Sequence, residues 1–158
     1  MDGVRENEEY LIRFLRAEDL PRLVKMDQAA SGRNRRAWYE GKLRRALEES
    51  DVRISLGAEV DGVLVGALMG SVQYGEFGQP EPVAILDTVL VDRSFGRRGI
   101  ATAMLGQLLQ NLRGLRLATL RTELAWDELD LLAFFGKSGF RPVPRLVLEK
   151  NVMQEGEE

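Results

Sequence analysis

The spacing of apolar residues divides the first third of the chain into one strand and two helices. Residues 10–16 alternate in part and predict a strand. Residues 17–31 have acidic residues in the first turn and the spacing of a helix that ends at Ser31-Gly32. A second helix is predicted over residues 35–49. We expect its buried side to be formed by Trp38, Leu43, Ala46 and Leu47.

The middle of the chain has the pattern of paired strands. Residues 53–60 and 63–72 flank Asp61-Gly62, a favoured two-residue turn, and predict a hairpin. Residues 75–82 are rich in glycine and proline and predict a loop. Residues 84–91, AILDTVLV, are almost all apolar or β-branched, which predicts a central strand buried on both faces.

The last third of the chain predicts two more helices separated by a strand. Residues 100–112 form an amphipathic pattern with a spacing of four, carried by Ile100, Met104, Leu108 and Leu112. Residues 115–123 predict a strand, and residues 126–137 predict a helix that ends at Ser138-Gly139. The final strands are predicted at Phe140 and over residues 145–149, separated by Pro142 and Pro144.

This order of elements defines an α/β (α+β) fold. Helices interrupt the strands near both ends while the middle is a meander, so a doubly wound parallel sheet is excluded. We expect a mixed, mostly antiparallel twisted sheet of about seven strands, flanked by about four helices. One domain is predicted over residues 9–150, with flexible tails at residues 1–8 and 151–158.

Composition restricts the chemistry and the partners of the chain. It has 158 residues, with 22 basic and 25 acidic side chains and a formal net charge of -3, which speaks against a nucleic-acid partner. It has no cysteine and no histidine, so thiol nucleophiles, disulfides and imidazole bases are excluded. The polar N-terminus and the lack of a long apolar run predict a cytoplasmic protein with no membrane partner.

The turn between the strand at 84–91 and the helix at 100–112 carries the most informative motif. Its sequence holds Gly96, Arg97, Arg98 and Gly99 directly before the helix. Free N–H groups at a helix N-terminus favour an anion such as a pyrophosphate, and Gly99 permits close approach to the backbone. The alternative is a basic surface turn that caps an ordinary helix.

Two motifs together resemble the GNAT-type N-acetyltransferases, the family related to the GCN-five histone acetyltransferases. Residues 96–101, GRRGIA, resemble the family's acetyl-CoA signature, and residues 135–140, FGKSGF, resemble its second signature. Two departures are visible. Gly96 stands where the family prefers arginine or glutamine, and Phe135 replaces a tyrosine that often protonates the leaving thiolate.

The resemblance implies a GNAT-like acyl-CoA N-acyltransferase fold and direct transfer of an acetyl group from acetyl-CoA to a primary amine in a ternary complex. No metal is implied. The strand backbone would bind the carbonyl and the pantetheine arm, and the turn would bind the pyrophosphate. The residues implied in acetyl-CoA binding are Val89, Leu90, Val91, Gly96, Arg97, Arg98, Gly99, Ile100, Ala101, Thr102, Phe134 and Lys137. Trp126, Phe134 and Phe135 are also expected to contribute to the core.

Three side chains are candidates for proton transfer. Asp87 interrupts an apolar strand and is the preferred base, because a carboxylate there would stand alone among apolar neighbours. It could instead be a structural aspartate or lie at a bulge. Glu123 is the second candidate base, or a surface residue paired with Arg121. Tyr74 is the candidate general acid.

The acceptor remains open, since a small molecule or a peptide could supply the amine. The basic segment 33–45 is either a solvated helix face or one lip of the acceptor site. A homodimer is compatible with the sequence. The alternative function is a non-catalytic acyl-CoA-binding or regulatory module, which the two departures from the family motifs favour.

Overall fold

The structure is a computed structural model that describes residues 10–50, 52–96 and 99–154. The chain divides into two compact units, residues 1–123 and residues 124–158, and each is described by itself. The single domain over residues 9–150 stays a prediction. The candidate tail at residues 1–8 lies outside the described residues.

The first unit is built on a mixed sheet in the order β1-β2-β3-β4-β5. Its strands are β1 (Leu11–Phe14), β2 (Leu56–Val60), β3 (Val63–Glu76), β4 (Gln79–Val91) and β5 (Leu120–Thr122). The first four are antiparallel neighbours, and β5 runs parallel to β4. The mostly antiparallel α/β fold is therefore confirmed, with five strands in the described part of the chain where about seven were expected.

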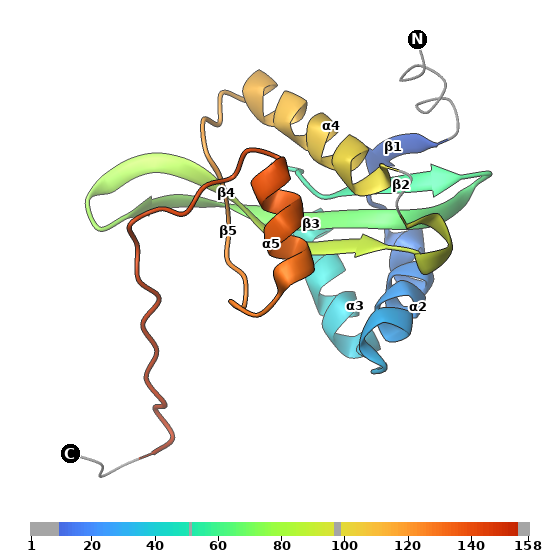
Figure 1. Ribbon diagram of the computed structural model, residues 1–158, viewed down its shortest axis with the longest axis horizontal. Helices are drawn as coiled ribbons and strands as arrows, with labels where there is room; N and C mark the ends of the chain where they lie inside the picture. Colours follow the sequence, from blue (N-terminus) through green and yellow to red (C-terminus); the bar gives the residue numbers. More distant parts are fainter. Residues whose placement is uncertain (1–9, 51, 97–98, 155–158) are drawn as a thin grey trace. The chain divides into compact units, whose positions relative to one another are not determined.

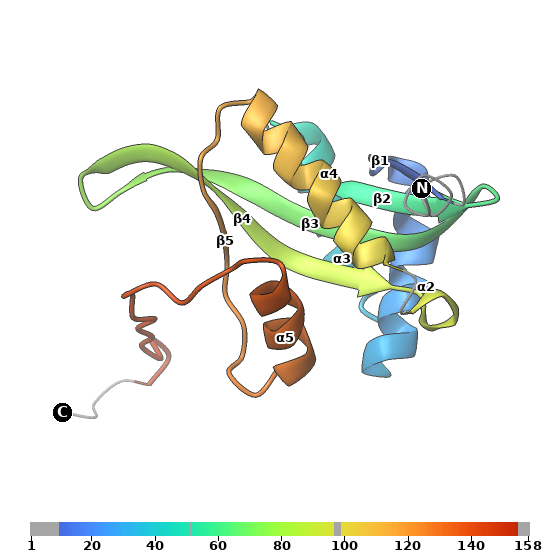
Figure 2. The same ribbon diagram turned by 45° about the horizontal axis from the view of Figure 1, so that its top comes forward.

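Helices cover both faces of this sheet (Figures 1 and 2). On one face lie α2 (Leu20–Ser31), which follows the short η1 (Ala17–Asp19), and α3 (Arg36–Arg44), which continues into the π-helical η2 (Arg45–Glu49). On the other face lies α4 (Ile100–Gly114), which follows η3 (Arg93–Phe95). Within the described ranges, no helix has the length and apolarity to cross a membrane.

The two helix layers bury most of the apolar positions that the sequence predicts, although Ala46 and Leu47 are only half-buried. Tyr39 and Leu43 form the buried side of α3, whereas Trp38 is 49% exposed, so the expectation that Trp38 is buried is wrong. The core on this face consists of Leu15, Leu23, Val24, Met26, Tyr39, Leu43, Leu64, Ala67 and Met69. On the other face, α4 buries the predicted row Ile100, Met104, Leu108 and Leu112.

Two tight hairpins shape the long central strands. Asp61 and Gly62 have φ angles of 50° and 77°, as expected for the predicted two-residue turn. The loop predicted over residues 75–82 is wrong, because β3 continues to Glu76 and β4 begins at Gln79. Phe77 (φ 48°) and Gly78 (φ 77°) form a second two-residue turn. The prolines that suggested a loop fit here because this part of β4 is an edge.

The strand β4 is less enclosed than its apolar sequence suggests. It pairs with β3 along its length, but with β5 only from Ala84 to Leu86. The strand predicted over residues 115–123 shrinks to Leu120–Thr122, because the turn that ends α4 includes Leu115 and Arg116, and Arg116 has a φ of 60°. From Asp87 onward, the edge of β4 that faces β5 has no strand partner among the described residues. Asp87 is exposed and Val89, Leu90 and Val91 are half-buried, so the expected burial on both faces is wrong for this half.

The second unit contains α5 (Leu129–Lys137), which ends at Gly139 with a φ of 92°. Phe135 is buried and lies against Phe134 and Phe140, with ring centroids 5.2 and 4.9 Å apart. Trp126 is 94% exposed, so its predicted core position is wrong. The strands predicted at Phe140 and over residues 145–149 do not form in the described part of this unit, where two prolines remove backbone donors.

Candidate active site

A β-bulge turns Asp87 out of the regular ladder between β3 and β4. Met69 pairs with Thr88 and Gly70 pairs with Leu86, so Asp87 is the extra residue. A Cβ at Gly70 would run into the carbonyl oxygen of Ile85, and the Gly70 N–H donates to Ser55 Oγ at 3.2 Å. The bulge therefore depends on a glycine opposite the candidate base.

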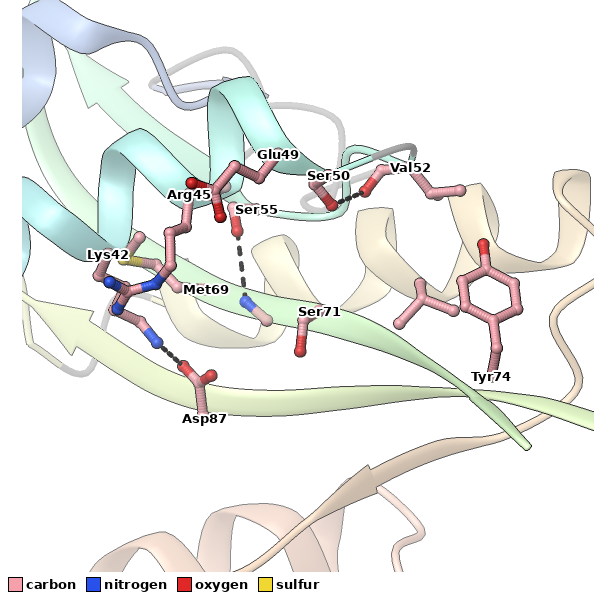
Figure 3. A pocket seen from close by; sticks show the side chains of 13 residues that line it. Lys42, Arg45, Glu49, Ser50, Val52, Ser55, Met69, Ser71, Tyr74 and Asp87 are labelled. Carbon is pink, nitrogen blue, oxygen red and sulfur yellow. Dashed lines mark hydrogen bonds and ion pairs between the residues drawn. The ribbon is translucent and has the colours of Figure 1, made fainter. Parts of the chain in front are cut away.

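The Asp87 carboxylate is ion-paired and 41% exposed rather than enclosed by apolar neighbours. Lys42 Nζ, on α3, lies 2.6 Å from Asp87 Oδ1, and the Thr88 hydroxyl donates to the same oxygen at 2.8 Å. The Lys42 ammonium also lies 5.1 Å from the centre of the Trp38 ring. Both polar contacts use Oδ1, and Oδ2 is turned away from Lys42 (Figure 3).

Asp87 lies in the wall of a pocket of about 420 Å³ between α3, η2 and the two central strands. Figure 3 shows the side chains that line it. The helical side supplies Lys42, Arg45, Ala46, Glu49 and Ser50, and the strands supply Met69, Gly70, Ser71, Val72, Tyr74 and Asp87, with Val52 and Ser55 between them. Asp87 and Tyr74, two of the three candidates for proton transfer, therefore line the same pocket, but they lie far apart along it (Figure 3).

Tyr74 and Glu123 take different positions relative to this pocket. Tyr74 lies on β3 and is 63% exposed. Glu123 directly follows Thr122, which pairs with Leu86, so Glu123 comes next to Asp87 in the parallel register where β4 and β5 separate. It is exposed and does not line the pocket. Arg121 pairs with Glu76 at 3.1 Å, so the ion pair proposed between Arg121 and Glu123 is wrong.

Buried polar contacts hold α3 in place at the pocket. Asp27 on α2 is buried and accepts hydrogen bonds from Arg35 Nε at 2.9 Å and Nη2 at 2.6 Å. The Tyr39 hydroxyl donates to the same carboxylate at 3.2 Å. Burial and the nearby Asp27 carboxylate raise the pKa of Tyr39, so this hydroxyl stays a donor. These contacts join the start of α3 to α2.

The open edge of β4 leads from the pocket to the glycine turn. Val89, Leu90 and Val91 pair with β3 on one side only, through Leu68, Ala67 and Gly66. Their other side offers backbone N–H and C=O groups of the kind that a ligand amide can match. These are the three residues that the sequence predicts for carbonyl and pantetheine binding.

The end of β4 is fixed before the turn begins. Arg22 on α2 pairs with Asp92 at 2.9 Å and donates to the Leu64 carbonyl at 2.9 Å. The hydrogen bond from Arg22 lowers the pKa of Asp92. Asp92 also accepts from the Ser94 N–H at 2.9 Å. The turn therefore starts from a rigid point on the sheet.

The turn ends in a left-handed glycine at the start of α4. Gly99 has a φ of 74° and open space around its Cβ position. Ile100 is buried, Ala101 is half-buried and Thr102 is exposed. The first amides of a helix lack intrahelical acceptors and carry partial positive charge, which suits a phosphate. Arg97 and Arg98 lie outside the described residues, and Gly96 is exposed.

The remaining predicted cofactor residues belong to the second unit. Phe134 and Lys137 lie on α5, half-buried and exposed respectively. Their part in cofactor binding stays a prediction. Phe135 contacts two phenylalanines, as expected for a core residue.

Sequence reasoning did not single out Arg45 and Glu49, which both line the pocket. They bound the π-helical segment η2, where each turn holds more residues than in an α-helix. Apolar periodicity gives no sign of such a turn. The cluster of basic residues over 33–45 was the available signal, and Lys42 and Arg45 of this cluster line the pocket. Its role as a lip of the acceptor site stays a prediction.

A mixed sheet with an open central strand edge, joined by a glycine turn to a helix N-terminus, is the arrangement expected from the two sequence motifs. The chain belongs to the Acetyltransferase (GNAT) family, whose family model matches residues 9–140. It is therefore an acetyl-CoA-dependent N-acetyltransferase, and the predicted family is confirmed. A comparison with curated proteins found no match.

Solved structures with low sequence identity share the fold. The aminoglycoside N-acetyltransferase AAC(6')-Iy, solved in complex with CoA, has a TM-score of 0.77 and 16% identity over 90% of this chain and 95% of its own. The enzyme AAC(6')-Ih from Acinetobacter baumannii has a TM-score of 0.75 and 21% identity over 90% and 99%. A ribosomal-protein-alanine N-acetyltransferase from Brucella melitensis has a TM-score of 0.71 and 18% identity over 90% and 99%.

Proposed function

We propose that the protein transfers an acetyl group from acetyl-CoA directly to a primary amine held in the pocket beside Asp87. One observation carries this proposal. Asp87 is both a wall of the pocket and the first residue of the open edge of β4. A donor along that edge and an acceptor in the pocket would therefore meet at Asp87, which is the requirement for a ternary complex.

The residues of the first unit fit the parts of an acyl-CoA donor. The amides at the start of α4 and the left-handed Gly99 suit a pyrophosphate. The free edge at Val89, Leu90 and Val91 suits the amides of a pantetheine arm. Acetyl-CoA, when bound, supplies the acetyl thioester. Structures of this fold solved with CoA, such as AAC(6')-Iy, support this assignment.

Asp87 is the proposed base. Its Oδ2 takes one proton from the acceptor's ammonium, which frees the nitrogen lone pair to attack the thioester carbonyl. As the C–N bond forms and the C–S bond breaks, the nitrogen loses a second proton, which balances the proton that the departing thiolate takes up. Thr88 and Lys42 hold Oδ1 and so fix the carboxylate. Glu123 is the alternative base, acting through a water. Solvent is the proposed proton donor to the departing thiolate, because the phenyl ring of Phe135 cannot donate and Tyr74 pairs with Pro82, five residues along β4 from Asp87.

The test compares Asp87→Asn with the parent protein in a thiol-release assay. The chain has no cysteine, so every thiol detected comes from CoA. We expect kcat to fall by about 10²–10⁴-fold, because asparagine keeps the size but cannot accept the proton, while the acetyl-CoA Kd stays unchanged. Glu81→Gln is the matched control, since Glu81 is an exposed acid on β4 outside the pocket.

Other outcomes would reassign the chemistry. Full activity of Asp87→Asn together with loss in Glu123→Gln would move the base to β5. Full activity of both would mean that the amine arrives deprotonated and the protein acts by positioning. Binding of acetyl-CoA without thiol release for any amine would support the alternative function, a non-catalytic acyl-CoA-binding module.

A further inference from the structure

The pocket beside Asp87 contains a cation that the proposed mechanism does not use. Its charged lining consists of Lys42 and Arg45 against Glu49 and Asp87. Lys42 is paired with Asp87. Arg45 and Glu49 are exposed, and within the part of the chain that the structure describes neither side chain has a hydrogen bond or an ion pair. The guanidinium of Arg45 is therefore available to a ligand.

Local backbone structure directs Arg45 toward the pocket. Arg45 begins the π-helical segment η2, and π-helical turns are frequent at functional sites. Its Nη1 would lie 3.3 Å from a Cβ at Gly41, so the glycine on the preceding turn leaves room for the folded side chain. Figure 3 shows Arg45 extending beside Lys42 toward Asp87.

The helix that borders the pocket carries a surplus of positive charge. Residues 33–45 contain Arg33, Arg35, Arg36, Lys42, Arg44 and Arg45 but only one acid, Glu40. Asp27 pairs with Arg35 and Asp87 pairs with Lys42, so Arg45 is the cation of the pocket lining that stays without an ion pair in the described residues. Its charge attracts an anionic group and disfavours another cation beside it.

We infer that the acceptor is a small amine that also bears a carboxylate, with the carboxylate held by Arg45 and the amine facing Asp87. This inference rests on the proposed function. A guanidinium binds a carboxylate through two parallel hydrogen bonds, and a cavity of about 420 Å³ has the size of a small-molecule site. The aminoglycosides in the names of several structural neighbours are polycations, and here the pocket offers them no surplus of acids.

The experiment compares acceptors that differ only in the carboxylate. Amino acids and their amides are assayed in pairs by thiol release, with kanamycin, spermidine and O-phosphoethanolamine as further acceptors. For each protein, kcat/KM for the amino acid is divided by kcat/KM for its amide. Because an amide also changes the basicity of the amine, this ratio in the parent is then divided by the same ratio in Arg45→Gln. We expect this quotient to be about tenfold or more, through a higher KM for the carboxylate acceptor.

Arg44→Gln is the matched control, since Arg44 is an exposed arginine of α3 outside the pocket lining. It should leave the ratio unchanged. Calorimetry of the same acceptor pairs with CoA-loaded protein gives a second measurement that does not need turnover. Tighter binding of the carboxylate member, lost in Arg45→Gln, would support the inference even if the proposed base were wrong.

Three results would overturn the inference. Kanamycin or spermidine could be the better acceptor, with no effect of Arg45→Gln. O-phosphoethanolamine could exceed every carboxylate acceptor, which would assign the site to a phosphate. The amino acid and its amide could bind the CoA-loaded parent with equal affinity. Arg45 would then have no role in binding a carboxylate, whether or not thiol is released.

Discussion

At the scale of single residues, Gly99 combines two properties that matter for donor binding. Its φ of 74° favours glycine, and the space beside it is open. We expect Gly99→Val to weaken acetyl-CoA binding by about tenfold or more, which is 1.4 kcal/mol, because a branched side chain would stand where the pyrophosphate approaches the first amides of α4. Calorimetry on the folded variant measures this.

Two further variants separate obstruction from backbone strain. Gly99→Asn keeps the left-handed conformation, which asparagine tolerates, and still adds a side chain, so it should also weaken binding. Gly106→Val places the same valine in the middle of α4, again with open space, and should leave the Kd unchanged. Unchanged affinity in both Gly99 variants would contradict the placement of the pyrophosphate.

The residues that could be predicted from the sequence are those whose role follows from a local pattern. Gly99 stands between a strand and a helix, and the left-handed conformation found there fits that position. Asp87 was visible as a charge in an apolar strand, but its exposure was not, because the local pattern does not show that the pairing of β5 with β4 stops at Leu86 and Thr122. Arg45 was hidden among neighbouring basic residues, because only the π-helical turn distinguishes it from Arg44.

At the scale of elements, the bulge between β3 and β4 depends on Gly70. A Cβ there would collide with the backbone carbonyl of Ile85, which cannot move without shifting the strand. We expect Gly70→Ala to lower the free energy of unfolding by about 1–3 kcal/mol and to lower kcat, because Asp87 would move with the bulge. Denaturant unfolding and thiol release measure the two effects.

The control for this variant is Gly106→Ala. That position is helical and open, so alanine should be neutral or stabilise the protein by up to about 1 kcal/mol through helix propensity. A Gly70→Ala protein as stable and as active as the parent would show that the ladder tolerates a side chain here, and the bulge would then not position Asp87.

Helices and strands were predictable from the sequence where one face of the element is buried and where the residues of a turn determine its conformation. The helix at 100–112 and the hairpin at Asp61-Gly62 are confirmed for this reason. The loop predicted at 75–82 was wrong because prolines and glycines suit both a loop and the tip of an edge hairpin. The strands predicted after Gly139 were wrong because a strand needs a partner, and an apolar run such as 145–149 does not show whether one exists.

At the scale of the whole molecule, the stability of the first unit should depend on acidic pH through Asp19. Burial opposes ionisation of this carboxyl, but hydrogen bonds from Arg13 at 2.8 and 2.9 Å and from the Arg16 N–H at 2.8 Å hold its pKa below the usual range. A lowered pKa in the folded state means that the contribution is complete above the unfolded value of about 3.9 and is lost as pH falls through the folded value.

We therefore expect Asp19→Asn to reduce the free energy of unfolding near pH 7 by about 1–3 kcal/mol, and the difference from the parent to shrink below about pH 4. Denaturant unfolding at a series of pH values measures this. Glu18→Gln is the control, because Glu18 is the exposed neighbouring acid. A difference that does not change with pH would mean that Asp19 acts by packing alone.

The short pairing of β5 with β4 has a consequence for how the protein behaves without its donor. Beyond Leu86, the backbone of β4 has no strand partner on one side among the described residues, and an open strand edge is a template for pairing with other chains. A pantetheine arm along that edge would act as a missing strand, so donor binding and folding become one linked equilibrium. A donor at a hundred times its Kd adds about 2.7 kcal/mol to the folded state. The acetyl donor would then be both a substrate and a structural part of the sheet, and cells rich in acetyl-CoA would hold this protein in its more stable and less aggregation-prone form.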